Sequence, residues 1–167
     1  KDSPNLGPGE ITVKNDPRVL PFGRFLRKTK INELPQLINV LTGDMSVIGP
    51  RPQSKRCFDA FPERSQVEIA KVRPGLSGIG SVVFRGEEEM MDAASDPDAF
   101  YDQAIMPYKG RLEEWYVANR SIRLYFALIF VTAWVVVFPG SRLFWRVFRQ
   151  LPKPPEELRR FFQATSD

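Results

Sequence analysis

Residues 124–138 read LYFALIFVTAWVVVF, a stretch that is almost wholly apolar and ends at Pro139 and Gly140. A helix of that length reaches about 22 Å, which is short of the roughly 30 Å hydrocarbon core of a bilayer. We therefore predict a helix that is buried in the protein or partly embedded in a membrane, without crossing it.

The segment after this stretch is basic and aromatic. In a helix over residues 141–151, Arg142, Arg146 and Arg149 form one narrow stripe. Phe144 and Phe148 lie on the opposite side. This separation predicts a helix on an anionic membrane surface, and the alternative is an ordinary helix that packs its aromatic side on the core. The residues assigned to the membrane interface are Trp134, Phe144, Trp145, Phe148, Arg142, Arg146 and Arg149.

Apolar spacing and turn residues place the other elements. Helices are predicted from the N-cap Asn32 to Gly43, from about Pro62 to Lys71, and from Asp96 onward with a break at Pro107. The glycine-rich residues 72–80 are predicted to be a loop, and residues 81–84 a short strand. The fold class expected from these elements is α+β, mainly helical with a small β component and with amphipathic, membrane-associated helices at the C-terminal end.

Histidine is absent from the 167 residues, and Cys57 is the single cysteine. Within these residues the composition excludes a Ser-His-Asp or Cys-His triad, His-ligated zinc and an internal disulfide. Chemistry must therefore come from carboxylates, Arg, Lys, Ser, Tyr or a metal. Nucleic-acid binding is not expected, although the pI is about 9.4, because the positive charge lies beside Trp and Phe and matches no groove-binding motif.

Three loops stiffened by Pro or Gly each contain an arginine: Arg51 in GPRP (49–52), Arg73 in VRPG (72–75) and Arg85 in FRG (84–86). Guanidinium groups bind phosphate oxygens, and a rigid loop lowers the entropy cost of holding them. These loops predict a diphosphate or phosphorylated substrate. Carboxylates flank the first helix at Glu33 and Asp44, where they are candidates for Mg²⁺ binding or nucleophilic attack.

Several short motifs occur in an order and spacing that resembles one protein family. They are DPR (16–18), GRFLRKT (23–29), NELPQL (32–37), NVL (39–41), GDMS (43–46), GPRP (49–52) and RPGLSG (73–78). Residues 16–121 thus resemble the bacterial sugar transferases, the monotopic phosphoglycosyl transferases that begin exopolysaccharide, O-antigen and glycoconjugate assembly.

The resemblance implies transfer of a sugar 1-phosphate from a UDP-sugar to polyprenyl (undecaprenyl) phosphate, with Mg²⁺ and release of UMP. It places the protein on anionic lipids at the cytoplasmic face of the bacterial inner membrane. Residues 1–123 then form the catalytic domain, N-terminally incomplete, and residues 124–167 form the membrane-interface helices and tail. Whether the chain forms a homo-oligomer is left open.

By matching motif positions, Glu33 resembles the family's catalytic and metal-binding carboxylate, with Asp44 as a second metal candidate. Arg27 and Arg51 resemble phosphate ligands, and Arg73 and Arg85 resemble ligands of the nucleotide diphosphate. We expect Arg51, Arg73 and Arg85 to surround one cavity near Glu33.

Asn32 occupies the position of the family's nucleophilic aspartate, and a neutral amide is a poor nucleophile. Either Glu33 takes over, or this subgroup works differently, or the chain is inactive, or the residue is an engineered change. A non-catalytic membrane scaffold or regulatory paralogue is therefore the alternative function. The chain also begins downstream of the family's membrane hairpin, so it resembles a C-terminal portion of a longer transferase.

Overall fold

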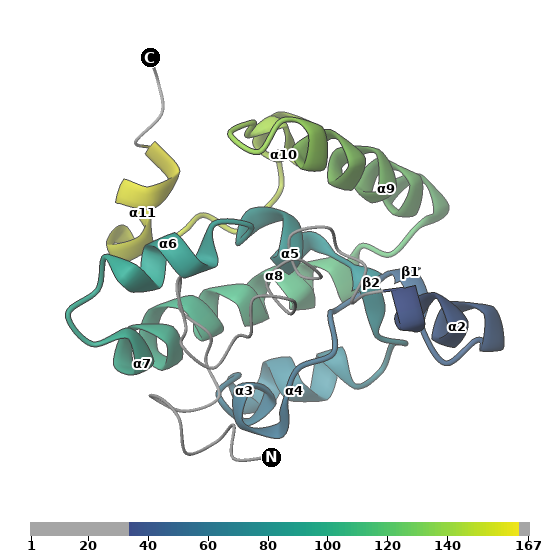
Figure 1. The fold of residues 1–167 in the computed structure, drawn as a ribbon, viewed down its shortest axis with the longest axis horizontal. Coiled ribbons are helices and arrows are strands. Elements are labelled where there is room, and N and C mark those ends of the chain that lie inside the picture. The colour runs from purple at the N-terminus through teal and green to yellow at the C-terminus, as the bar shows by residue number, and fades with distance from the viewer. Residues whose placement is uncertain (1–33, 164–167) are drawn as a thin grey trace.

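The computed structural model describes residues 34–163, and helices dominate this range (Figure 1). The elements are α2 (Leu34–Thr42), β1 (Ser46–Ile48), α3 (Lys55–Asp59), α4 (Glu63–Ile69), β2 (Gly75–Ser77), α5 (Ile79–Val83), α6 (Glu87–Asp92), α7 (Pro97–Phe100), the π-helical turn η3 (Tyr101–Ile105), α8 (Met106–Ala118), α9 (Ile122–Val137), α10 (Leu143–Val147) and α11 (Glu156–Gln163). The mainly helical fold with a small β component is confirmed. Within this range, no helix has the length and apolar character needed to span a bilayer.

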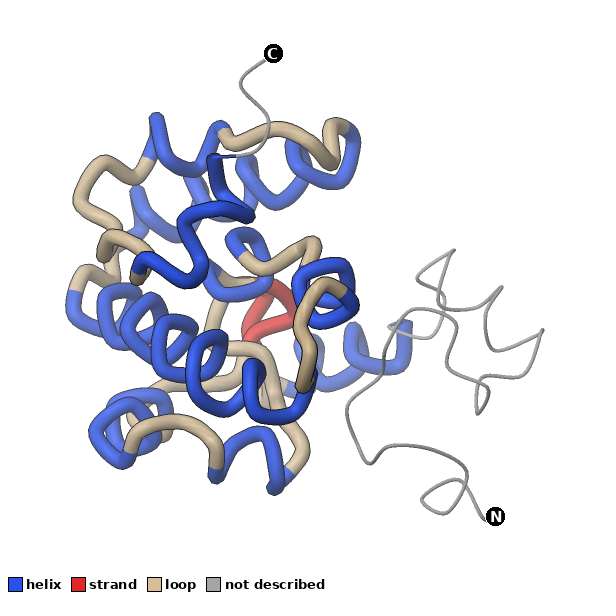
Figure 2. Tube along the Cα trace, turned by 90° about the vertical axis from the view of Figure 1, so that its left-hand side faces the viewer, coloured by secondary structure: helices blue, strands red, loops and turns tan. Residues whose placement is uncertain are grey.

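The two strands form a small parallel sheet. Ser46 lies opposite Gly75, and Ile48 lies opposite Ser77. Helices surround this sheet on several sides (Figure 2). The start of β2 and the residue after β1 approach so closely that a Cβ atom on Gly75 would collide with backbone atoms of Gly49. Residues 75–77 were predicted to be part of a loop, but they form a strand because glycine permits this contact.

Several predicted helices are present. α2 ends at Thr42, and Gly43 follows with φ of 85°, the left-handed conformation that glycine adopts at helix ends. α4 falls within the predicted span of residues 62–71. Asp96 caps α7, because its side chain accepts a hydrogen bond from the backbone N–H of Ala99 at 3.0 Å. Local periodicity and capping residues thus identified these elements correctly.

Two local predictions are wrong. Residues 81–84 do not form a strand, since residues 81–83 belong to α5, which buries Ile79, Val82 and Val83 at helical spacing. Burial on one helix face outweighs the strand preference of valine. The chain also does not break at Pro107. Proline lies in the first turn of α8, where its missing N–H costs little, and η3 leads directly into it.

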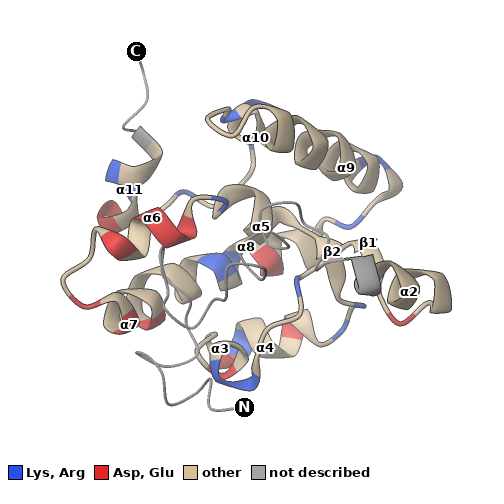
Figure 3. Ribbon diagram, viewed as in Figure 1, with Lys and Arg blue, Asp and Glu red and all other residues tan. Residues whose placement is uncertain are grey.

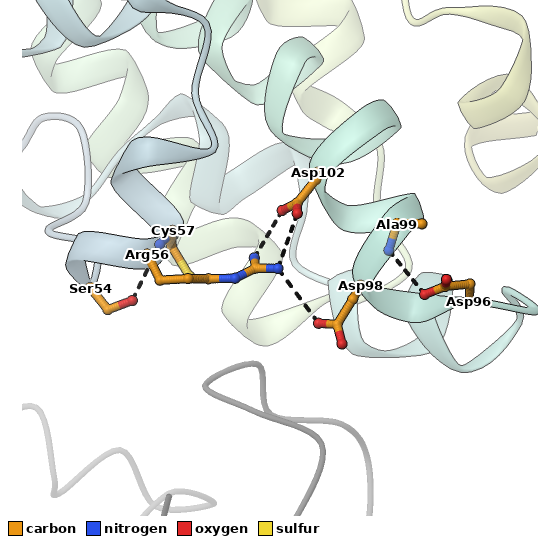
Figure 4. A network of polar contacts seen from close by, with 7 residues as sticks. All are labelled: Ser54, Arg56, Cys57, Asp96, Asp98, Ala99 and Asp102. Carbon is orange, nitrogen blue, oxygen red and sulfur yellow. Dashed lines mark hydrogen bonds and ion pairs between the residues drawn. The ribbon is translucent and has the colours of Figure 1, made fainter.

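An ion-pair network joins α3 to η3 and α7 (Figure 4). The two terminal nitrogens of Arg56 donate to the two carboxylate oxygens of Asp102 at 2.9 and 3.1 Å. Asp98 lies 3.7 Å from the same guanidinium, which also lies 5.6 Å from the centre of the Tyr101 ring. The network holds η3 against α3, which lies more than forty residues earlier in the chain.

The apolar segment of residues 124–138 forms most of α9, as predicted. One side of α9 is buried, with Leu128, Val131 and Val135 in the same core cluster as residues of α5 and α8. The opposite side is exposed and apolar. That core also includes Leu151 and Leu158, so residues on both sides of the predicted domain boundary at 123 and 124 share it.

The predicted amphipathic helix over residues 141–151 is reduced to α10 (Leu143–Val147). Phe144 and Phe148 are buried in the core, so the predicted insertion of these two side chains into lipid headgroups is wrong. The cause is local packing: Trp145 contacts the ring of Phe162 on α11, and Arg142 donates to the carbonyl oxygen of Phe161 at 2.9 Å. The burial of Phe144 and Phe148 supports the alternative weighed for this segment, an aromatic side that packs on the core. The assignment of Trp134, Trp145, Arg142, Arg146 and Arg149 to the membrane interface stays a prediction.

Candidate functional site

The predicted site residues fall into two groups. Arg27, Asn32 and Glu33 lie outside the described residues 34–163. Asp44, Arg51, Arg73 and Arg85 lie inside them, at the ends of short elements. Arg73 is separated from β2 by Pro74 alone, and Arg85 lies just after α5.

Arg73 lines a cavity of about 620 Å³ together with Arg120, which follows α8. Arg120 donates from Nε to the carbonyl oxygen of Val117 at 3.2 Å. Among the described residues, neither arginine forms an ion pair with a carboxylate. The cavity therefore contains two positive charges that no acidic side chain described here neutralises, an arrangement suited to an anion.

Hydroxyl groups complete the polar lining of the cavity. The hydroxyls of Ser46 on β1 and Tyr125 on α9 lie 3.4 Å apart. Tyr116 donates to the carbonyl oxygen of Ile48 at 3.2 Å. Burial, and secondarily the charge of Glu113, raises the pKa of Tyr116 above its ordinary value, so its hydroxyl remains a donor. Ser121 accepts from the N–H of Leu124 and caps α9 at the cavity wall.

Arg85 lines a different cavity, of about 300 Å³, together with Arg142 and Arg160. The expectation that Arg51, Arg73 and Arg85 surround one cavity near Glu33 stays a prediction because Glu33 lies outside the described residues, but these two cavities place Arg73 apart from Arg85. The reason is α5, which continues as a helix where a strand was expected and leads the chain toward α6 and α11. Arg51, in the turn after β1, lines neither of these two cavities.

Asp44 follows α2 and is exposed, and its Oδ2 accepts a hydrogen bond from the Thr42 hydroxyl at 2.6 Å. Carboxylate oxygen is the donor that Mg²⁺ prefers, so Asp44 is of a suitable type. Within residues 34–163, however, no three His, Cys, Asp or Glu side chains gather as a metal site would require. The partner predicted for Asp44 was Glu33, so the assignment of Mg²⁺ to these two residues stays a prediction.

Sequence reasoning missed two buried ionisable residues on α8, Lys109 and Glu113. Lys109 and Glu113 are 7% and 3% exposed. Lys109 pairs with Glu87 at 2.8 Å, and Glu113 accepts from the backbone N–H of Gly80 at 3.2 Å. Burial, opposed by Lys109 and by this hydrogen bond, raises the pKa of Glu113 from 4.5 to about 7. A Lys and a Glu four residues apart are typical of a solvated helix surface, so the sequence held no signal for this burial.

Arg120 was also missed, since it lies in no proline-stiffened or glycine-stiffened loop. Its place beside Arg73 depends on the way α8 ends next to β1 and β2, which is a tertiary relationship. Only the packing of the elements could reveal it.

Comparison with known proteins assigns the family. The family model described as bacterial sugar transferase matches residues 1–139. The chain belongs to the bacterial sugar transferase family. The described residues that line the Arg73–Arg120 cavity fall within the matched part of the chain, whereas Arg142 and Arg160 of the Arg85 cavity lie beyond it.

Curated proteins similar to this chain come from several bacteria. An undecaprenyl-phosphate galactose phosphotransferase of Salmonella typhimurium is 35% identical over 128 residues, which cover 77% of the present chain and 23% of that protein. A UDP-glucose:undecaprenyl-phosphate glucose-1-phosphate transferase of Escherichia coli is 42% identical over 83 residues, or 48% of this chain and 18% of that protein. The exopolysaccharide production protein ExoY of Rhizobium meliloti is 40% identical over 75 residues, which cover 45% of this chain and 33% of that protein. The chain thus spans about a quarter of the length of the first of these relatives.

Proposed function

We propose that the chain carries the catalytic part of an enzyme that transfers a sugar 1-phosphate from a UDP-sugar to polyprenyl phosphate and releases UMP. Family membership and the named activities of the Salmonella and Escherichia relatives support the reaction class. The structural observation that carries the proposal is the Arg73–Arg120 cavity, in which two guanidinium groups have no carboxylate partner among the described residues.

In this reaction the bond between the bridging oxygen and the sugar-bearing phosphorus breaks. The bridging oxygen leaves as part of UMP, and a new phosphorus–oxygen bond forms to the phosphate of the polyprenyl acceptor. Guanidinium groups stabilise the charge on phosphate oxygens during such transfers. Asn32 offers no anionic oxygen, so the attacking oxygen comes from Glu33 in a two-step route or directly from the acceptor.

Glu33 and Asp44 are the residues that would hold Mg²⁺ in this proposal. When bound, the ion would neutralise charge on the diphosphate of the UDP-sugar. The arginine residues then position the phosphate groups, a role that does not require them to transfer protons.

The exposed side of α9 is proposed as the surface that docks on the cytoplasmic face of the inner membrane. Ile122, Phe126 and Phe130 are 75%, 63% and 58% exposed, and Trp134 continues the same stripe one turn further on. In Figure 3 the ribbon of α9 has no acidic residue along its length and is basic only near its start. A stripe of exposed apolar side chains suits the headgroup region of a bilayer.

The experiment that tests the function is UMP release by the full chain, in detergent or lipid, with undecaprenyl phosphate and a panel that includes UDP-galactose and UDP-glucose. Release should depend on both donor and acceptor and should fall at least about tenfold in Arg73→Ala. If the chain binds a UDP-sugar without releasing UMP from any donor, the reaction is refuted and the non-catalytic paralogue, which Asn32 favours, is supported.

A further inference from the structure

The Arg73–Arg120 cavity opens beside the exposed apolar side of α9. Ile122 belongs to both: it lines the cavity, and three quarters of its surface is exposed. Phe126 and Phe130 follow Ile122 at intervals of one helical turn, about 6 Å each. The positive cavity and the apolar stripe therefore form one continuous surface.

The cavity end of this surface suits a terminal phosphate group. Arg73 and Arg120 supply the guanidinium groups, and Ser46 and Tyr125, whose hydroxyls lie 3.4 Å apart, also line the cavity. The N-terminus of the 16-residue helix α9 also lies here, and its partial positive charge favours an anion. Among residues 34–163, no Asp or Glu lines this cavity.

The Arg85 cavity lacks this combination. Glu89 is part of its lining, Arg142 already donates to the carbonyl oxygen of Phe161, and Arg160 lies over the Phe161 ring at 4.6 Å. As far as the described residues show, the cavity lined by Arg73 and Arg120 combines two arginines with the exposed start of α9 and has no Asp or Glu in its lining. The ligand that fits this surface is an amphiphile with a phosphate at one end.

We infer that the Arg73–Arg120 cavity binds the phosphate of the polyprenyl acceptor, and that the first isoprene units lie along Ile122 and Phe126. This inference rests on the proposed function for the identity of the acceptor. It assigns Arg73 to the acceptor, although the sequence motifs had placed it beside the nucleotide diphosphate. Arg120 becomes a binding residue that the sequence did not identify.

The test measures direct binding of farnesyl phosphate to the full chain, without donor and without turnover. Farnesol, inorganic phosphate and UDP-galactose are the comparison ligands, and phosphatidylglycerol vesicles test a general preference for anionic headgroups. The variants are Arg120→Ala, Arg120→Lys and Arg73→Ala. Arg123→Ala is the matched control, because Arg123 is exposed, lies three residues from Arg120 and does not line the cavity.

The unaltered chain should bind farnesyl phosphate at least about tenfold more tightly than either farnesol or inorganic phosphate, because both ends of the ligand are recognised. Arg120→Ala and Arg73→Ala should each weaken this binding about tenfold or more. Arg120→Lys should recover part of the affinity, and Arg123→Ala should leave it unchanged. UDP-galactose affinity should stay the same in all variants.

A loss of UDP-galactose binding in Arg73→Ala or Arg120→Ala, with farnesyl phosphate binding intact, would assign the cavity to the donor and overturn the inference. An equal loss of farnesyl phosphate affinity in Arg123→Ala would mean that binding is general charge attraction, and this would also overturn the inference. Equal effects of the Arg73 and Arg120 substitutions on binding to phosphatidylglycerol vesicles would have the same meaning. Failure of the proposed function is distinguishable, since farnesyl phosphate binding through Arg120 without any UMP release supports the site and refutes the reaction.

Discussion

Glu113 and Gly80 meet at the centre of the molecule, where one carboxylate oxygen of Glu113 accepts a hydrogen bond from the backbone N–H of Gly80 at 3.2 Å. The other oxygen, Oε2, is buried and has no hydrogen-bond partner among the described residues. This contact links α8 to α5, whose Val82 and Val83 line the Arg85 cavity.

Replacing Gly80 by alanine should destabilise the fold. A Cβ atom at this position would approach Glu113 Oε1 far inside contact distance, and it would press on the side chain of Lys109 at 3.2 Å. We expect Gly80→Ala to lower the free energy of unfolding by about 1–3 kcal/mol, measured by urea denaturation. Gly140→Ala is the control: no atom lies within 4 Å of its Cβ position, so its effect should stay within about 0.5 kcal/mol. Equal effects of the two substitutions would refute the contact.

Stability should depend on pH through Glu113. Its pKa is raised from 4.5 to about 7 in the folded state, so the folded protein binds the extra proton between these values. The contribution of Glu113 to the free energy of unfolding is complete below about pH 4.5 and is lost as pH rises through about 7. The free energy of unfolding should change by at most about 1.4 kcal/mol per pH unit in this window. Glu113→Gln should remove this part of the slope, measured by urea denaturation at pH 5, 6 and 7.5. A difference between the two proteins that does not change with pH would contradict the prediction.

Membrane docking should depend on α9. The double substitution Phe126→Ser and Phe130→Ser removes two exposed rings, each worth about 1.5–3 kcal/mol when buried in an apolar phase, so partitioning into anionic liposomes should fall at least tenfold. Flotation with liposomes measures this. Val67→Ser, an exposed apolar position on α4, should leave partitioning unchanged. If Val67→Ser has the larger effect, α9 is not the docking surface.

Asn32→Asp should restore or raise UMP release, because it adds an anionic oxygen with almost no change in volume. Glu33→Gln should abolish whatever activity exists. Both are measured with the donor and acceptor that give the highest release. Robust activity with Asn32 that falls on conversion to Asp would mean that the chain does not use an aspartyl-phosphosugar route.

Chelation with EDTA should abolish UMP release, and added Mg²⁺ should restore it, if Glu33 and Asp44 hold the ion. Asp44→Asn should raise the Mg²⁺ concentration needed for half-maximal activity, and thermal unfolding should show that the fold is intact. Activity that persists unchanged in EDTA would remove Mg²⁺ from the proposal.

Local signals in the sequence predicted those parts of the fold that local physics decides. Apolar spacing and Gly43 identified α2, Asp96 identified the start of α7, and residues 124–138 identified α9. The strand predicted over residues 81–84 failed because the burial of Ile79 and Val82 is a tertiary effect. The helix predicted over residues 141–151 is shortened to α10, and the inward packing of Phe144 and Phe148 is a tertiary effect that local periodicity does not show.

In the candidate site, too, the sequence predicted what local motifs determine and missed what tertiary packing determines. Motifs pointed to Arg73, but no local pattern could separate it from Arg85 or bring it beside Arg120, since these relations depend on α5 and α8. The buried position of Glu113 escaped for a related reason: helical spacing shows which residues share a face, and it does not show what covers that face.

The parallel pairing of β1 with β2 also affects how the chain is made. Ile48 leaves the ribosome about 30 residues before Ser77, the residue opposite it in the sheet. At roughly 5–20 residues per second, this interval lasts on the order of seconds. No other strand among the described residues pairs with β1. Until residues 75–77 have emerged, the backbone of β1 lacks its sheet partner, so the central sheet and the cavity beside it can assemble only after α3 and α4 have been synthesised.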